Sequence, residues 1–173
     1  MKSVLISIQP KWCKLIASGK KTVEVRKTRP KLETPFKVYI YETKGKKQYF
    51  SQPMPIPYNE GKGKVIGEFV CDVVISHCEM ANADIAEQQG CIKREKLLEY
   101  ANGKELYGWH ISDLVIYDKP KELSEFRKPC ANGLYCESCA MYSKFNDCCG
   151  NKALRITRPP QSWCYVEKEG VQE

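Results

Sequence analysis

Long hydrophobic runs are absent from this chain of 173 residues. No apolar stretch approaches the roughly 20 residues that a membrane-spanning helix requires. The apolar stretch that precedes Gln9 and Pro10 is also too short for a signal-peptide core, which needs about 7–15 residues. We therefore expect a cytoplasmic protein with no membrane partner.

Histidine is scarce, and internal repeats and low-complexity tracts are missing. Of the two histidines, His110 follows Trp109 and is a better candidate for a binding cleft than His77. The composition of 42% hydrophobic and 28% charged residues is that of an ordinary globular protein. The length suits one well-buried core, so we predict a single domain over residues 1–173.

Acidic residues are scarce in the N-terminal third. Residues 1–64 hold 15 lysines and arginines against 4 acids, whereas residues 65–173 hold 13 against 17, which together give the net charge of +7. A charge excess confined to one segment is typical of a face that binds a polyanion. A solvated lysine-rich surface is the competing interpretation.

Short strands account for most of the predicted secondary structure. β-Branched and alternating segments predict strands at 4–8, 21–27, 36–42, 64–75, 111–117 and 163–166. Pro10 suits the first turn of a helix and Gly19 suits its C-terminal end. Residues 82–101 predict two short helices, and residues 44–64 predict a long loop. This pattern predicts an α+β protein built on a small mixed β-barrel with helices at its rim.

A motif of the form Gly-x-Lys-x-x-Glu-x-Arg occupies residues 19–26. Strand alternation predicts that Thr22, Glu24 and Arg26 line one surface while the two intervening valines enter the core. Lys21 would then lie at the entrance of the strand. Glu24 and Arg26 would be about 7 Å apart, within reach of a common ligand or of each other. An ordinary surface ion pair, which contributes at most about 1 kcal/mol, is the alternative.

The motif at 19–26 is one of several motifs whose order along the chain resembles that of the ASCH domain. They are Ser7-Ile8-Gln9-Pro10, Trp12 on the first helix, the motif at 19–26, YIYET at 39–43, VIGEFVCD at 65–72, Trp109–Asp113 and Pro159–Trp163. The C-terminal half also resembles ASCH proteins that are common in phages and prophages. This resemblance implies a PUA-like β-barrel with a cleft beside the motif strand, in which RNA or a modified nucleoside is held.

The resemblance places Lys21, Glu24 and Arg26 at the motif positions of this cleft. An aromatic side chain beside them would stack on a base, which is worth about 1–3 kcal/mol. Burial in the core is the competing interpretation for such an aromatic residue. The predicted set for RNA or nucleotide binding is completed by Trp12, Tyr41 and His110.

Some small ASCH-like bacterial enzymes remove the acetyl group from acetylcytidine. They have a threonine at the position of Glu24, which works with the motif lysine and a later glutamate. Glu24 is not a hydroxyl nucleophile, and the later glutamate has no clear counterpart, although Glu87 lies in the comparable helical region. Lys21 and Glu24 could instead act as acid and base, either on a modified nucleoside or in RNA cleavage.

Cysteine is abundant, and five of the ten cysteines fall within residues 130–149. In a reducing compartment thiols stay free, bind metal or perform redox chemistry. Cys136 and Cys139 have the spacing that binds one cation, and Cys130 with Cys148 or Cys149 would complete a structural zinc site. We therefore predict a zinc-bound insertion at 127–152, which would also offer a surface to a protein partner. Free thiols and a disulfide are the alternatives.

Overall fold

Short strands dominate the computed structural model, which describes residues 2–44, 61–76, 84–130, 142–143, 148–149 and 151–168. The elements are, in chain order, β1 (Ser3–Ile8), α1 (Pro10–Ala17), β2 (Val23–Arg26), β3 (Phe36–Glu42), β4 (Val65–Cys71), β5 (Val74–Ile75), η1 (Asp84–Gln89), α3 (Arg94–Ala101), β6 (Tyr107–His110), β7 (Ser112–Lys121), η2 (Leu123–Glu125), β8 (Phe126–Arg127), β9 (Tyr142–Ser143), β10 (Cys148–Cys149), η4 (Lys152–Leu154) and β11 (Trp163–Lys168).

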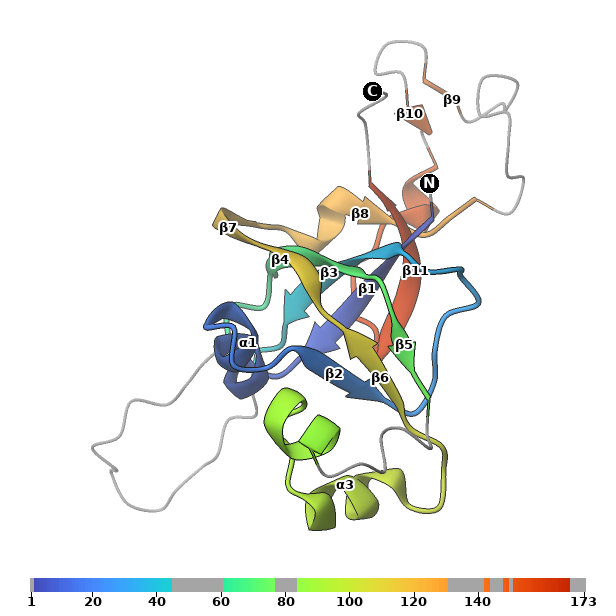
Figure 1. The fold of residues 1–173 in the computed structure, drawn as a ribbon. Helices are drawn as coiled ribbons and strands as arrows, with labels where there is room; N and C mark the ends of the chain where they lie inside the picture. Colours follow the sequence, from blue (N-terminus) through green and yellow to red (C-terminus); the bar gives the residue numbers. More distant parts are fainter. Residues whose placement is uncertain are drawn as a thin grey trace, which may run out of the picture.

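Two sheets build the part of the fold that positions the motif. The larger has the order β7-β4-β3-β1-β11-β8, and the smaller has the order β2-β6-β5. β1 pairs in parallel with β3 and antiparallel with β11, so the first and last strands are neighbours. The larger sheet curls into a half-barrel, with α1 beside one end and α3 beyond the smaller sheet (Figure 1). The predicted α+β class is confirmed in this form.

The central strands are buried on both faces. All six residues of β1 are buried, as their apolar sequence predicts. Val4 and Ile6 pack in one core cluster with Trp109 of β6, whereas Leu5 belongs to a second cluster on the other face. Trp109 is fully buried and meets the rings of Phe36 and Trp163 edge-on, at centroid distances of 5.8 and 5.9 Å.

The first helix begins and ends where the sequence predicts. Pro10 occupies its first turn, where the missing N–H leaves no donor unsatisfied. After Ser18 the chain turns through Gly19, whose φ of +72° is left-handed and therefore suits glycine. The N–H of Lys20 then bonds to the carbonyl of Leu15, 3.0 Å away, which closes the end of the helix.

Two predicted strands differ from the observed ones. The strand expected at 64–75 is divided into β4 and β5 by the exposed residues Asp72 and Val73. The strand expected at 111–117 extends to Lys121, and β6 precedes it without having been predicted. β6 is only four residues long and contains Gly108, so its pattern carries little strand signal. Within the described ranges no helix is long and apolar enough to cross a membrane.

Candidate functional site

β2 lies between two apolar clusters, so all four of its residues are buried. Val23 and Val25 pack against η1 and α3, in a cluster that includes Leu97. Glu24 is paired directly with Trp109 of β6 and therefore points to the other face, toward the half-barrel core. The prediction that Glu24 and Arg26 line an open surface is wrong, because only 5% and 9% of these residues are exposed.

Glu24 is the centre of a buried charge network. One carboxylate oxygen lies 2.9 Å from a terminal nitrogen of Arg26, and the other lies 3.5 Å from Nζ of Lys21. The structure thus brings the three charged motif residues together. Two cations around one carboxylate leave the network with a net positive charge, which favours a ligand that accepts hydrogen bonds.

Arg26 also joins three parts of the chain. The nitrogen that meets Glu24 donates to the carbonyl of Ser7 in β1 at 2.7 Å, and the other terminal nitrogen donates to the hydroxyl of Ser162 at 3.4 Å. Ser162 immediately precedes β11, so the guanidinium connects β1, β2 and β11. Its Nε is buried and has no hydrogen-bond partner among the described residues. Arg26 therefore has a structural role in addition to any contact with a ligand.

Lys21 is almost completely buried, with 2% of the residue exposed. Its ammonium donates to the carbonyl of Gly90, which follows η1, at 2.6 Å. Loss of hydration lowers the pKa of Lys21, and the neighbouring Glu24 opposes this shift. A lysine with a lowered pKa beside a carboxylate can exchange a proton more readily than a surface lysine.

Trp12 connects the buried network with solvent. Its ring is half-buried on α1 and packs against the main core cluster. Nζ of Lys11 lies 4.4 Å from the ring centroid, and Nζ of Lys21 lies 5.1 Å from it. The structure therefore brings Trp12 to the motif, in line with the sequence interpretation, and surrounds its ring with positive charge.

Tyr41 and His110 are not brought to this network. Tyr41 packs in the second core cluster, on the opposite face of β3 from the cluster that contains Trp109. His110 is paired with Val23 across the strands and so points away from the face of Glu24. Its Nδ1 lies 2.7 Å from a carboxylate oxygen of Asp72. We therefore leave Tyr41 and His110 out of the candidate site.

Glu42 is a buried acid that the sequence interpretation missed. Only 8% of it is exposed, and its carboxylate accepts the backbone N–H of Lys62 at 2.8 Å. Burial raises the pKa of the Cys13 thiol, and the charges of Glu42 and Glu24 raise it further. The sequence could have predicted this burial, because Glu42 lies two residues after the core residue Ile40 and therefore on the same face of the strand.

Glu87 has a different role from the one considered from the sequence. Its side chain is exposed, and the carboxylate accepts the backbone N–H of Arg94 at the start of α3, at 3.1 Å. An acid at a helix N-terminus is stabilised by the unpaired N–H groups there. Glu87 thus connects η1 with the start of α3.

The predicted zinc ligands lie mainly outside the described residues. Cys136 and Cys139 belong to the part of the chain that is not described, and only the backbone of Cys148 and Cys149 is placed, in β10. Cys130 is half-buried and forms no disulfide with any described residue. Among the described residues no group of three metal-ligating side chains occurs. The zinc site therefore stays a prediction.

Comparison with known proteins supports the family interpretation. The family model described as "ASCH domain" matches residues 6–125. The crystal structure of ASCH from Zymomonas mobilis is similar, with 19% identity, a TM-score of 0.57, and coverage of 96% of this chain and 89% of that one. A tyrosine-to-phenylalanine variant of that protein is 19% identical, with a TM-score of 0.55 and coverage of 98% and 93%. Its serine-to-alanine variant is 20% identical, with a TM-score of 0.57 and coverage of 96% and 89%. No curated protein matches the chain.

Proposed function

Because the chain belongs to the ASCH domain family, we propose that it binds RNA or a nucleotide through Trp12 and the Lys21–Glu24–Arg26 network. The observation that carries this proposal is the position of Lys21. Its ammonium is buried beside Glu24, yet it lies 5.1 Å from the centroid of the half-exposed ring of Trp12. A ligand that stacks on this ring would therefore lie beside the buried charges, with its polar edge turned toward Lys21.

The two parts of the site would contribute different interactions. The ring of Trp12 offers a stacking face, and an aromatic ring accepts any base because every base has a π-face. Lys11 and Lys14 are exposed on the same helix and supply positive charge for phosphates. Lys21 and Arg26 donate hydrogen bonds, whereas Glu24 accepts them from an amino group. The expected ligand is a nucleotide or an unpaired RNA segment.

Titration of mixed-sequence single-stranded RNA against the full chain tests the proposal. Affinity should fall steeply as salt increases, because each neutralised phosphate releases counterions. Lys11→Ala should lower both the RNA affinity and the slope of log affinity against log salt concentration. Lys104→Ala, at an exposed lysine after α3, is the matched control and should change neither. Binding that is absent, or that does not respond to salt, would remove the support for this function.

Hydrolysis of a modified nucleoside or of RNA is a second candidate. It is favoured by the pKa of Lys21, which burial lowers, and by the carboxylate oxygen of Glu24 at 3.5 Å. A panel of acylated nucleosides and RNAs should then contain a substrate whose turnover is lost in Lys21→Ala and Glu24→Gln. These variants must retain the wild-type circular dichroism spectrum. If the wild type turns over no member of the panel, the binding function stands alone.

A structural zinc ion held by the cysteine-rich segment is also part of the proposal. Cys136 and Cys139 would supply the close pair of thiolates, and Cys130 with Cys148 or Cys149 would complete the shell. Residues 130–149 contain few large aliphatic side chains, so a metal would order a segment that hydrophobic burial alone orders poorly. Such a lobe would give the protein a second surface for a protein partner.

A further inference from the structure

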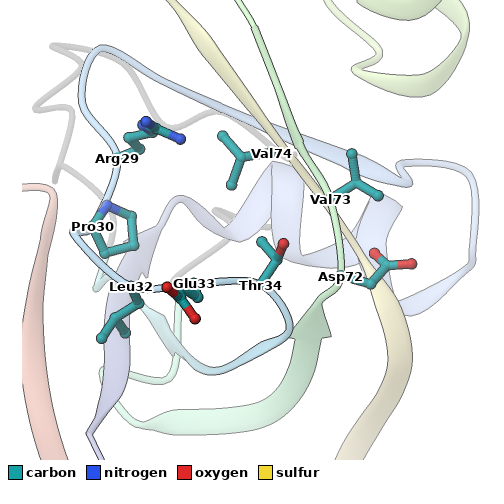
Figure 2. A pocket seen from close by; sticks show the side chains of 8 residues that line it. All are labelled: Arg29, Pro30, Leu32, Glu33, Thr34, Asp72, Val73 and Val74. Carbon is teal, nitrogen blue, oxygen red and sulfur yellow. The ribbon is translucent and has the colours of Figure 1, made fainter.

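A polar cavity lies apart from the motif network. Its volume is about 610 Å³, and it opens between the loop from Arg29 to Thr34 and the segment from Asp72 to Val74. Figure 2 shows these two segments facing each other across the cavity, each contributing polar and apolar side chains. Cavities of about 300–1,000 Å³ commonly bind small ligands. Lys21 and Glu24 do not line this cavity, so a ligand bound there would occupy a site separate from the one in the proposed function.

The loop wall of the cavity is fixed to the barrel. The indole N–H of Trp163 donates to the hydroxyl of Thr28 at 3.0 Å, and the backbone N–H of Lys31 donates to the hydroxyl of Tyr165 at 2.7 Å. Both aromatic residues belong to β11, and their rings meet edge-on at a centroid distance of 5.4 Å. The loop is thus held at two points, which reduces the ordering that a ligand must impose.

The opposite wall is fixed by β6. The carboxylate of Asp72 lies 2.7 Å from Nδ1 of His110, and the backbone N–H of His110 donates to the carbonyl of Val73 at 3.0 Å. The hydrogen bond between the Asp72 carboxylate and the imidazole of His110 lowers the pKa of Asp72, so the carboxylate stays charged at neutral pH. Val73 is nonetheless 51% exposed and presents apolar surface at the rim.

The charges around the cavity select the ligand. Arg29 contributes one positive charge, and Glu33 and Asp72 contribute two negative charges, so the lining has a net charge of −1. This balance disfavours a phosphate and favours a ligand that donates hydrogen bonds to carboxylates. Leu32 and Val74 both line the cavity and pack against the core, where they offer an apolar surface to a flat ring.

We propose that this cavity binds a nucleobase that carries an exocyclic amino group, as in cytidine or adenosine. The amino group would donate to the carboxylate of Glu33 or Asp72, the pairing by which acidic side chains recognise the amino group of cytosine. Arg29 would donate to a ring nitrogen or carbonyl on the same base. Uridine presents a carbonyl oxygen where cytidine presents the amino group, and a carboxylate repels it.

Titration of the ¹⁵N-labelled full chain with cytidine, adenosine and uridine tests this site. Cytidine or adenosine should shift the amide signals of residues 29, 31–34 and 72–74 and bind about tenfold more tightly than uridine, since one lost hydrogen bond to a charged group costs at least that factor. Glu33→Gln or Asp72→Asn should remove this preference. Glu105→Gln, at an exposed acid outside the cavity, is the matched control and should keep it.

Three results would overturn the proposal. The first is equal binding of cytidine, adenosine and uridine by the wild-type chain, or no binding of any of them. The second is binding of spermidine, a plain polyamine, without binding of the nucleosides. The third is a set of shifted signals confined to the surroundings of Trp12 and Lys21, with none from the cavity residues, which would assign the nucleoside to the network alone. Lys21→Met should weaken RNA binding but leave the shifts of the cavity residues in place, because Lys21 does not line the cavity; failure of the RNA-binding proposal can therefore be told apart from failure of this one.

Discussion

The carboxylate of Glu24 lies 2.9 Å from the guanidinium of Arg26, and both side chains are at least nine-tenths enclosed. A pair in this position differs from a surface ion pair, because each charge has lost most of its water. Each partner therefore depends on the other, and removal of one leaves an uncompensated charge in the core.

Glu24→Gln should destabilise the protein strongly. The substitution keeps the shape of the side chain but leaves the buried cations of Lys21 and Arg26 without their carboxylate. We expect the free energy of unfolding to fall by about 3–5 kcal/mol. Urea denaturation followed by circular dichroism measures it. Lys64→Met, which breaks an exposed ion pair with Glu122, should cost at most about 1 kcal/mol. Equal losses in the two variants would contradict the burial argument.

Lys21 should make stability depend on pH in the alkaline range. Its folded-state pKa is lowered below the ordinary value of 10.5, so the folded chain releases this proton before the unfolded chain does. Between the two pKa values the unfolded state binds more protons, and the contribution of Lys21 to stability rises with pH. The urea midpoint of the wild type minus that of Lys21→Met should therefore increase as the pH is raised toward 10.5. A constant difference would show that the pKa of Lys21 is the same in both states.

Trp12 should contribute to RNA affinity through its ring. Trp12→Ala is expected to weaken binding by about 1–3 kcal/mol, whereas Trp12→Phe should retain most of the affinity because the ring is kept. Fluorescence anisotropy with a labelled single strand measures both. Tyr100→Ala, at an exposed aromatic residue on α3, should leave binding unchanged. A loss of affinity in Trp12→Phe as large as in Trp12→Ala would show that stacking is not involved.

Zinc analysis under reducing conditions should find one ion per chain. Cys136→Ser should lower the zinc content, since three thiolates bind the ion less tightly than four. Cys164→Ser, in β11, should leave the content unchanged. Removal of the ion by a chelator should lower the melting temperature, because binding energy of the metal contributes to folding. A metal-free protein with an unchanged melting temperature would exclude the site.

Much of the fold could be predicted from local patterns. The apolar run before Pro10, the proline and glycine at the ends of α1, and the β-branched and aromatic residues of β3 each correspond to a local preference that the fold satisfies. β6 was not predicted, because its four residues carry little strand signal. Its position is determined by pairing with β2 on one side and with β5 on the other. Tertiary pairing of this kind leaves no trace in a short segment.

The composition of the candidate site was predicted, but its burial was not. The motif spacing identified Lys21, Glu24 and Arg26, and the structure brings them together. Alternation alone assigns polar residues to solvent, and it could not show that helices cover one face of β2 while the core covers the other. Tyr41 was misplaced for a related reason, since motif order does not tell which face of a strand meets the site.

The hydrogen bond from Arg26 to Ser162 has a consequence for synthesis on the ribosome. The two residues are separated by 136 positions, and β1 likewise waits for β11 to pair along one side. At translation rates of about 5–20 residues per second, the motif strand emerges roughly 7–27 seconds before its last partner. The link from Arg26 to the segment before β11 is therefore made only when the final strand arrives, and a chain that stops short of it carries the motif without this link.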